Sequence, residues 1–437
     1  MKKAAIYTLG CKVNTYDSEA IREILEKNGY KTVEFDEQAD VYVINTCTVT
    51  NLGDKKSRQM IRKAKKNNPM SIVVVCGCYA QTSPEVLEEM PEVDVLMGTN
   101  ERSRIIEYIQ KKQENNETFR SVKDIMEVRE FEALSIEGIQ GRTRDFIKIQ
   151  EGCDRFCSYC IIPYARGPIR SRNPEEVLKE VRQIVNNGSR EIVLTGIHIS
   201  SYGKDLKMER GLLELIQALE NVEGLQRIRI SSLEPGIMTE AFIQELAKCT
   251  KVCDHFHLSL QSGSKTVLQR MKRRYSPEEY RKATQLLRTY FPNCSLTTDV
   301  MVGFPGETEE EFEESYRFIK DIAFSTLHVF KYSKREGTPA AKYADQVPAK
   351  VKDDRSKRLI ALSEDLAYSY QNRFLNQKMP VLMESRLEDQ PDVYQGHTTN
   401  YLLVRGRSDR NLVNQIVTVQ LESIENDHVV GSILKES

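Results

Sequence analysis

The chain has 437 residues with a formal net charge of −1, and this length suits roughly two or three domains with cores of their own. The near balance of charge excludes a whole-molecule basic field that would attract nucleic acid, so any nucleic-acid site must be local. The ten cysteines favour metal or redox use in a reducing compartment over disulfides. With no stretch approaching the roughly 20 apolar residues of a membrane span, we expect a soluble, cytoplasmic protein.

Residues 1–115 alternate between strand-like and helix-like patterns, which predicts a parallel sheet flanked by helices. We expect this amino-terminal domain to be followed by a linker at 116–142, where the chain is charged and has little apolar periodicity. The predicted elements of the domain lie at residues 4–9, 16–28, 41–45, 55–66, 71–76, 86–90, 93–97 and 103–113.

Three cysteines of this domain follow predicted strands: Cys11, Cys47 and Cys78. A parallel sheet collects its ligands beyond the carboxyl ends of its strands, so the three thiols should meet on one rim. There they could hold three irons of a [4Fe–4S] cluster. Cys76 competes with Cys78, and we favour Cys78 because it lies beyond Gly77, outside the strand. Buried structural cysteines, which are common in apolar strands, are the alternative.

A second set of cysteines, Cys153, Cys157 and Cys160, has C-x3-C-x2-C spacing and follows a strand-like segment at 146–149. Gly152 allows a sharp turn at the strand end. Three thiolates in one loop can hold three irons of a [4Fe–4S] cluster and leave the fourth iron open. An open iron can chelate the amino and carboxylate groups of S-adenosylmethionine. A zinc site fits less well, because it usually takes four ligands in two separated pairs.

Residues 143–372 are expected to form a central domain, because six strand-like segments alternate with helical ones, as in a partial (β/α)6 barrel. The chemistry of such a barrel lies at the carboxyl ends of its strands. The strands are predicted at 146–149, 191–194, 226–230, 255–260, 295–302 and 326–332, and the helices at 174–187, 211–220, 239–248, 264–271, 277–290 and 309–322. Polar residues after these strands are the candidates for cofactor binding: Gly196, Ser232, Glu234, Gln261, Ser262 and Asp299.

A long helix predicted at 351–374 leads into a carboxyl-terminal domain, residues 373–437, with short strands separated by turns. This pattern of short strands and turns predicts a small all-β barrel of the size of an oligonucleotide-binding module. Tyr401, Arg405 and Arg407 are candidate RNA contacts, because they combine aromatic and basic side chains. A structural cap is an alternative that these residues support equally well. The strands are predicted at 379–384, 394–397, 401–404, 415–421 and 429–433.

Together these motifs resemble the radical S-adenosylmethionine methylthiotransferases. The resemblance rests on residues 9–14 (Leu-Gly-Cys-Lys-Val-Asn), 45–47, 77–81, 152–163, 259–264, 303–308, 332–333 and 337–339. It implies an α/β protein with an amino-terminal cluster domain, a radical S-adenosylmethionine core and a carboxyl-terminal RNA-binding barrel of the TRAM type. Residues 45–58 resemble the branch that modifies N6-threonylcarbamoyladenosine in tRNA, with Gly53 where alanine is expected.

The resemblance implies an enzyme that adds a methylthio group to C2 of threonylcarbamoyladenosine beside the anticodon, giving 2-methylthio-N6-threonylcarbamoyladenosine. It implies two [4Fe–4S] clusters on the two cysteine sets, S-adenosylmethionine, a tRNA partner and an electron donor such as flavodoxin or ferredoxin. The sulfur donor and the catalytic residues are not identified by the sequence. Isopentenyladenosine in tRNA and an aspartate of a ribosomal protein are alternative substrates, and a metal-stabilised RNA-binding scaffold is the non-enzymatic alternative.

Polar contacts near the pocket are expected from Asn14, Asn45 and Gln81, together with Gln261 and Ser262. The threonylcarbamoyl group carries a carboxylate that the isopentenyl group lacks, so its pocket should contain a cation or several donors. Near the expected barrel mouth the chain offers Lys331, Lys334 and Arg335 for this purpose.

Overall fold

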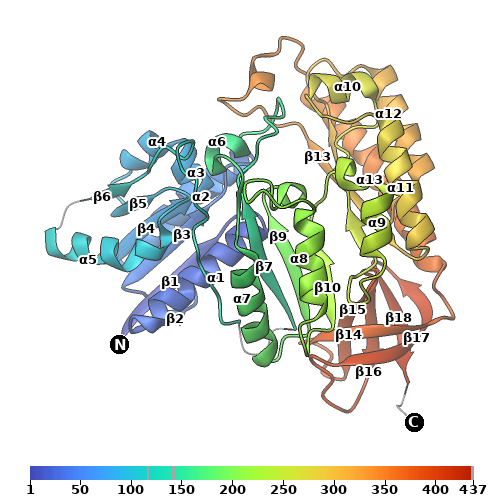
Figure 1. The fold of residues 1–437 in the computed structure, drawn as a ribbon. Helices are drawn as coiled ribbons and strands as arrows, with labels where there is room; N and C mark the ends of the chain where they lie inside the picture. Colours follow the sequence, from blue (N-terminus) through green and yellow to red (C-terminus); the bar gives the residue numbers. More distant parts are fainter. Residues whose placement is uncertain (116–117, 139–142, 435–437) are drawn as a thin grey trace.

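The computed structural model describes residues 1–115, 118–138 and 143–434. It has an amino-terminal α/β part, a central curved sheet with its helices, and a carboxyl-terminal β-barrel (Figure 1). The predicted fold class is therefore confirmed. Of the linker expected at 116–142, residues 116–117 and 139–142 lie outside the described residues, as do 435–437 of the last domain.

The amino-terminal part is a six-stranded sheet in the order β2-β1-β3-β4-β5-β6, and all its pairings are parallel. Apolar side chains of α1 and α5 pack on one face of the sheet, and those of α2, α3 and α4 pack on the other. The strands are β1 (Lys2–Thr8), β2 (Tyr30–Val33), β3 (Val41–Thr46), β4 (Ile72–Gly77), β5 (Val95–Met97) and β6 (Phe119–Ser121). The helices are α1 (Lys12–Lys27), α2 (Asn51–Asn67), α3 (Cys78–Thr82), α4 (Pro84–Glu88) and α5 (Ile105–Asn115).

Two strands of this sheet, β2 and β6, were not predicted. Both are short edge strands whose side chains are partly exposed, so neither has an apolar pattern long enough to recognise. Strand β6 lies inside the stretch expected to be a linker and extends the sheet through its pairing with β5. The buried Leu134 and Ile136 of the same stretch pack into the core of the central part. Apolar contacts therefore hold the segment that connects the amino-terminal and central parts.

The central part contains the six predicted parallel strands in two sheets, β10-β9-β7-β8 and β11-β12-β13. Parallel bridges from Ile228 to Val252 and from Leu233 to Leu258 join the two sheets into one open barrel. The short β8 pairs antiparallel with β7 and was not predicted. The strands are β7 (Arg144–Glu151), β8 (Arg170–Ser171), β9 (Glu191–Gly196), β10 (Arg227–Ile230), β11 (His255–His257), β12 (Ser295–Val302) and β13 (Thr326–Lys331).

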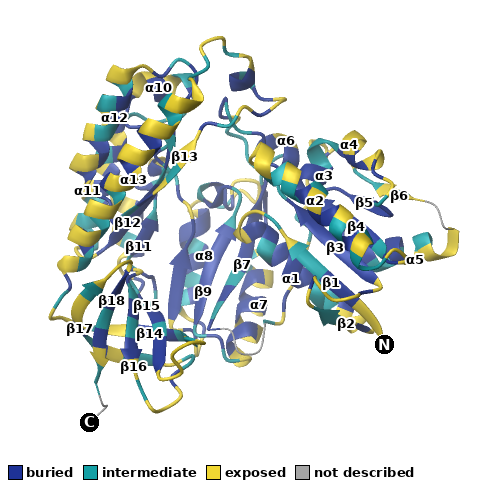
Figure 2. Cartoon of the chain, turned by 180° about the vertical axis from the view of Figure 1, so that it is seen from behind, coloured by how far each residue is buried: buried dark blue, intermediate teal, exposed yellow. Residues whose placement is uncertain are grey.

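Helices cover the outside of this barrel, and their exposed outer faces are evident in Figure 2. Two of them begin with a capping box, Ser276 with Glu279 and Thr308 with Glu311, in which side chains satisfy backbone donors that have no helical partner. The helices are α6 (Ile162–Arg166), α7 (Pro174–Asn186), α8 (Gly211–Glu220), α9 (Glu240–Leu246), α10 (Lys265–Arg270), α11 (Pro277–Tyr290), α12 (Glu309–Ile322) and α13 (Ala349–Asn372).

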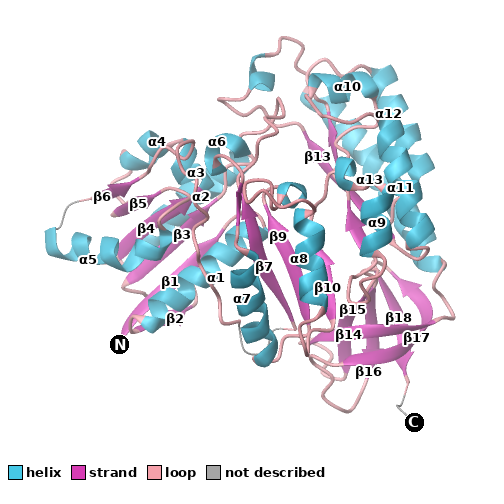
Figure 3. Ribbon diagram, viewed as in Figure 1, coloured by secondary structure: helices cyan, strands magenta, loops and turns pink. Residues whose placement is uncertain are grey.

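The carboxyl-terminal part is a closed five-stranded barrel in the order β14-β15-β16-β18-β17 (Figure 3). All five strands were predicted. Its core includes Tyr370 of α13 and Phe374 just beyond that helix, so the helix is anchored in the barrel. The strands are β14 (Lys378–Arg386), β15 (Val393–Thr398), β16 (Leu403–Arg407), β17 (Ile416–Glu425) and β18 (His428–Ile433).

A buried ionic network fixes the amino-terminal part against the central barrel. Asp17 of α1 accepts hydrogen bonds from Arg102, from Lys148 of β7 at 2.5 Å and from Arg166 of α6 at 3.1 Å. Glu151 of β7 pairs with Lys148 at 3.1 Å and also with Arg166. All five side chains are at most 1% exposed. Burial would raise the pKa of Asp17, but the cations outweigh burial and lower it.

Removing one charge from this network should destabilise the fold strongly. We predict that Lys148→Met lowers the free energy of unfolding by about 3–5 kcal/mol, because it leaves two buried carboxylates short of a counter-charge. The measurement is urea unfolding followed by circular dichroism. The matched control is Lys331→Met, since Lys331 forms an exposed pair with Asp353 and its loss should cost less than about 1 kcal/mol. Equal losses in both variants would contradict the prediction.

Candidate functional site

The first set of cysteines lies on one rim of the amino-terminal sheet. Cys11 is the N-cap of α1, Cys47 follows β3, and Cys78 is the first residue of α3. Gly10 has φ +109°, and a Cβ on it would lie only 3.2 Å from the Cys47 Sγ, so only glycine lets these two loops approach this closely. Cys11 and Cys47 both act electrostatically on Cys78. Cys76, the competing candidate, is fully buried in the apolar core beneath this rim.

Asparagine side chains hold the two loops that carry Cys11 and Cys47. The amide of Asn14 donates to the Leu9 carbonyl at 2.6 Å and to the Thr46 carbonyl at 3.0 Å. The amide of Asn45 donates to the Asn14 carbonyl at 3.0 Å. Both asparagines are buried. The structure therefore gives them a scaffolding role, whereas the sequence had suggested contacts to a ligand.

The second set of cysteines occupies one loop between β7 and α6. Gly152 has φ +75°, and a Cβ on it would collide with the Pro168 carbonyl, which confirms the expected glycine-dependent turn. The chain then doubles back, with the Cys153 amide donating to the Gly167 carbonyl at 2.9 Å and the Cys160 amide to the Cys157 carbonyl at 3.0 Å. Cys153 and Cys157 both act electrostatically on Cys160.

Each cysteine set has an arginine against one of its thiols. Arg166 Nε donates to the Cys78 Sγ at 3.2 Å, and Arg273 Nη1 donates to the Cys157 Sγ at 3.4 Å. Burial raises the pKa of Cys78 to about 11, while Arg166 opposes this rise. Burial likewise raises the pKa of Cys160 to about 12. Both are all-sulfur donor sets with an arginine in contact with one thiol. Cys78 and Cys157 are buried, Cys47, Cys153 and Cys160 are half-buried, and Cys11 is exposed.

A cavity of ≈ 720 Å³ connects the three parts of the molecule. Cys11 and Lys12 line it from the amino-terminal part, and Tyr401 lines it from the carboxyl-terminal barrel. The remaining wall is the inner face of the central barrel, including Phe146, Thr195, His255, His257, Thr297 and His328. A chamber of this volume falls in the range of small-molecule sites.

The six candidates for cofactor binding fall into two groups. Gly196, Ser232 and Asp299 line the cavity, whereas Glu234, Gln261 and Ser262 do not. Ser262 is buried, and its hydroxyl accepts from the Ser264 amide at 3.2 Å, within its own turn. Gln261 has φ +69° and bridges to Val300 of β12.

Glu234 belongs to the surroundings of the second cysteine set. It pairs with Arg155 at 2.9 Å, with the His198 Nε2 at 3.0 Å and with Arg273 at 3.3 Å. Burial would raise the pKa of Glu234, but these partners outweigh it and lower the pKa to about 2. Because Arg273 also contacts Cys157, Glu234 helps to orient the guanidinium that touches the thiol.

The cations expected near the barrel mouth are Lys331, Lys334 and Arg335, and they lie outside this cavity. Arg335 is buried and pairs with Asp54 at 2.7 Å, and it also donates to Asn51 at 2.8 Å. Arg335 thus holds the first turn of α2, which begins four residues after Cys47. Lys331 forms an exposed pair with Asp353 at 2.7 Å, and Lys334 is exposed. None of the three lines the cavity.

The cations that do line the cavity are Lys12, Arg144 and Arg229. Burial lowers the pKa of Lys12, and Arg144 and Arg229 lower it further, so the three positive charges lie close enough to interact. The sequence contained one indication that Lys12 lies at the cavity, because Lys12 directly follows Cys11. Arg144 lies in β7 and Arg229 in β10. The sequence does not show which face of the sheet these charged strand residues occupy, so their place at the cavity could not be predicted.

The three candidates for RNA contact are separated in the structure. The Tyr401 ring is stacked between His255, at 4.6 Å between centroids, and His397, at 4.5 Å, where it forms part of the cavity wall. Its φ of +69° is a strained conformation for a tyrosine. Arg405 and Arg407 line a different hollow on the carboxyl-terminal barrel, and Arg407 pairs with Asp392.

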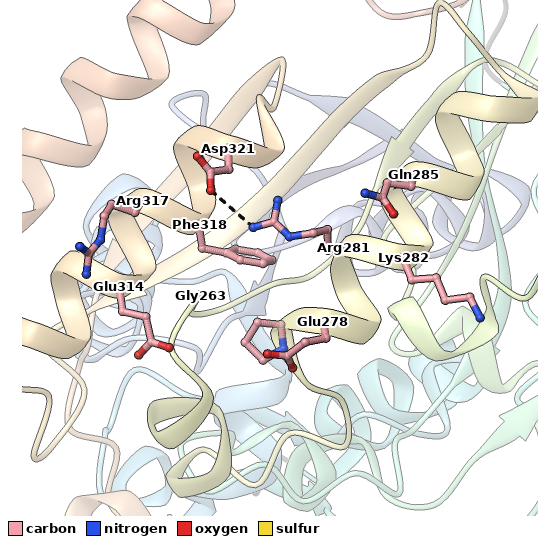
Figure 4. A pocket seen from close by; sticks show the side chains of 10 residues that line it. Gly263, Glu278, Arg281, Lys282, Gln285, Glu314, Arg317, Phe318 and Asp321 are labelled. Carbon is pink, nitrogen blue, oxygen red and sulfur yellow. Dashed lines mark ion pairs between the residues drawn. The ribbon is translucent and has the colours of Figure 1, made fainter.

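A further groove lies between α11 and α12 on the outside of the central barrel (Figure 4). Its charged side chains are of both signs, and Arg281 pairs with Asp321 at 3.5 Å. None of the predicted site residues lines this groove, although Gly263, the neighbour of Ser262, does. The groove therefore has no connection with either cysteine set.

Comparison with known proteins agrees with this arrangement. Residues 147–319 match the radical SAM superfamily, and residues 3–98 match an uncharacterized protein family, UPF0004. The threonylcarbamoyladenosine tRNA methylthiotransferase MtaB of Bacillus subtilis (strain 168) is 46% identical over 424 residues, which are 96% of this chain and 94% of that protein. The protein of the same name from Aquifex aeolicus (strain VF5) is 40% identical, over 88% of this chain and 94% of its own.

The chain belongs to the radical S-adenosylmethionine methylthiotransferase family. A second branch matches over the full length as well: the tRNA-2-methylthio-N(6)-dimethylallyladenosine synthase of Alkaliphilus oremlandii (strain OhILAs) is 35% identical over 100% of this chain and 93% of that protein. Among solved structures, the radical S-adenosylmethionine methyltransferase TsrM of Kitasatospora setae has a TM-score of 0.58 at 16% identity, covering 78% of this chain and 77% of that one. This last likeness supports the fold.

Methylthiotransferases of this family use S-adenosylmethionine and two [4Fe–4S] clusters, and the two cysteine sets fit such groups. Each thiolate of a cubane binds its own iron, so the sulfurs surround the cluster instead of converging on one ion. No three His, Cys, Asp or Glu side chains among the described residues are arranged to hold a single metal ion.

The two sets should load iron independently in this methylthiotransferase. We predict that replacing Cys153, Cys157 and Cys160 by Ala removes about half of the iron, since we expect these thiolates to be the ligands of one cluster. Replacing Cys11, Cys47 and Cys78 should remove the other half while reductive cleavage of S-adenosylmethionine continues. Iron and sulfide analysis of anaerobically purified protein measures this. Cys76→Ala is the matched control and should keep all iron; full iron in the second triple variant would exclude the amino-terminal site.

Proposed function

We propose that this methylthiotransferase converts N6-threonylcarbamoyladenosine beside the anticodon of tRNA into 2-methylthio-N6-threonylcarbamoyladenosine. The observation that carries the proposal is the positively lined cavity, which reaches from Cys11 to the strand ends of the central barrel. An adenosine in this chamber would lie between a residue of the first cysteine set and the barrel. The identity with the two methylthiotransferases named MtaB supports the same substrate.

When bound, the clusters and S-adenosylmethionine supply the radical, the methyl group and the open irons for a reaction at an unactivated C–H. The chain's own residues bind these groups and position them relative to one another. We propose Cys11, Cys47 and Cys78 as ligands of one cluster and Cys153, Cys157 and Cys160 as ligands of the other. Gly196, Ser232 and Asp299 are proposed cofactor contacts inside the cavity, and Glu234 acts on the second site through Arg273. Walls from three parts of the chain surround this cavity.

The charge of the chamber favours the threonylcarbamoyl substrate over isopentenyladenosine. The former carries a carboxylate, and three cations line the cavity. An apolar isopentenyl tail would offer no counter-charge to the Lys12 ammonium, which makes no ion pair within the described ranges. The ribosomal-aspartate alternative has no support from the relatives described above, which are named for tRNA substrates.

The proposed division of labour follows the three parts of the chain. Residues 1–115 carry the first cluster, residues 143–372 form the radical core, and residues 373–437 form a TRAM module that binds RNA. A low-potential electron carrier of the flavodoxin or ferredoxin type is the proposed reductant. Among the described residues, no helix combines the length and apolar character needed to cross a bilayer.

Nucleosides from cells test the proposed substrate. We predict that deleting the gene abolishes 2-methylthio-N6-threonylcarbamoyladenosine in tRNA and leaves the unmethylthiolated precursor to accumulate. The measurement is mass spectrometry of digested tRNA, with the intact gene restored as the control. Loss of the methylthio-isopentenyl nucleoside, or an unchanged tRNA profile together with loss of a modified ribosomal aspartate, would overturn the proposal.

Basic residues on the carboxyl-terminal barrel should contribute to RNA affinity without taking part in the chemistry. We predict that the double variant Arg405→Gln, Arg407→Gln weakens tRNA binding and makes it less sensitive to salt, because fewer phosphate contacts release fewer counterions. Cleavage of S-adenosylmethionine with dithionite should be unchanged. The matched control is Lys282→Gln, Arg317→Gln in the groove of Figure 4, which should bind tRNA normally. An unaltered affinity in the first variant would reject this RNA-binding role.

A further inference from the structure

Among the described residues that line the cavity, Lys12 is a cation whose charge is not used by the fold. We infer that Lys12 binds the carboxylate of the threonylcarbamoyl group and thereby selects this substrate over adenosines with uncharged N6 substituents. The inference rests on the proposed function and assigns one residue to the recognition of the group that distinguishes the two tRNA substrates.

The other two cations of the cavity are already engaged. Arg229 donates to the Glu191 carboxylate at 2.7 Å and to the Thr399 carbonyl at 2.9 Å. Arg144 pairs with Glu384 at 3.4 Å and lies 3.7 Å from Glu191. Their guanidiniums therefore hold the carboxyl-terminal barrel against the central one, and much of their charge is compensated.

Lys12 differs from these arginines in having no such partner. Within the described ranges, its ammonium makes no hydrogen bond and no ion pair, although the side chain is accessible to solvent within the cavity. The carboxylate of the cavity wall, Asp299, acts on Lys12 only through space and lies 3.3 Å from the His257 Nε2. The three N–H donors of Lys12 are thus free for an anionic ligand.

The position of Lys12 matches the chemistry of the substrate. Lys12 immediately follows Cys11, so one turn of chain carries both a proposed cluster ligand and the ammonium. In adenine, the reacting C2 and the N6 that bears the threonylcarbamoyl group are separated only by N1 and C6. The group that delivers sulfur to C2 and the group that binds the carboxylate must therefore be no further apart than the threonylcarbamoyl group can reach. A lysine next to a cluster ligand meets this condition.

A phosphate of the RNA backbone is the other anion that Lys12 could meet, so the test must separate it from the carboxylate. The probes are three anticodon stem-loop RNAs of one sequence, which carry threonylcarbamoyladenosine, its methyl ester or unmodified adenosine. All three have the same phosphates, and the first alone has the free carboxylate. Binding is measured on the full chain with both clusters reconstituted, and iron content is recorded for every variant.

The wild-type protein should bind the carboxylate RNA roughly ten- to hundred-fold more tightly than the ester, the effect expected of a hydrogen bond between charged groups. Lys12→Met should bind both RNAs alike, and Lys12→Arg should keep the preference. Lys334→Met, which removes an exposed charge outside the cavity, is the matched control and should behave as wild type. Lys12→Gln provides a second uncharged variant, and the comparison with wild type uses whichever uncharged variant retains full iron.

The outcomes separate this inference from the proposed function. If the uncharged variant keeps the wild-type preference, Lys12 is not the carboxylate partner, while the proposed function stands. If it weakens binding of all three RNAs equally, Lys12 binds phosphate and the inference is wrong. If wild-type protein neither distinguishes the RNAs nor methylthiolates the carboxylate RNA, the proposed substrate itself is wrong.

Discussion

The structure depends on a charged network buried where apolar residues would ordinarily pack. Asp17 and Glu151 face Arg102, Lys148 and Arg166 across the contact between α1, β7 and α6. Taking charges out of water is costly unless each finds several partners, so this network tolerates only one relative placement of the amino-terminal sheet and the barrel. Glu151 stands two residues before Cys153, and Arg166 touches Cys78. The contact that joins the two parts therefore also sets the separation of the two cysteine sets.

A similar double use of charge is seen around the cavity. Arg144 and Arg229 serve as structural cations between the central and carboxyl-terminal barrels, while their side chains also form a positively charged wall. Glu191 and Glu384 compensate much of the charge of this wall. An anion in the cavity would therefore be attracted mainly by the ammonium of Lys12, which forms no ion pair within the described ranges.

Much of this arrangement could be predicted from the sequence, because the signals are local. The six barrel strands, the five strands of the last barrel and the two cysteine sets all follow from periodicity, turn residues and spacing. Strands β2 and β6 were missed because edge strands of three or four residues carry too little pattern. The roles of Arg335, Asn14 and Asn45 could not be predicted, because each is decided by a partner far away in the chain, as when Arg335 meets Asp54. Tyr401 is separated from Arg405 because Tyr401 lies before β16, where its ring stacks on His255 and His397, whereas Arg405 lies within β16.

The place of Tyr401 has a consequence for how such proteins can be recombined. A carboxyl-terminal module that only gripped RNA could be exchanged between relatives as an independent part. Here the module also supplies an aromatic ring, stacked between His255 and His397, as one side of the cavity. A chimera that carries the module of a relative with another substrate would therefore also carry part of that relative's cavity wall.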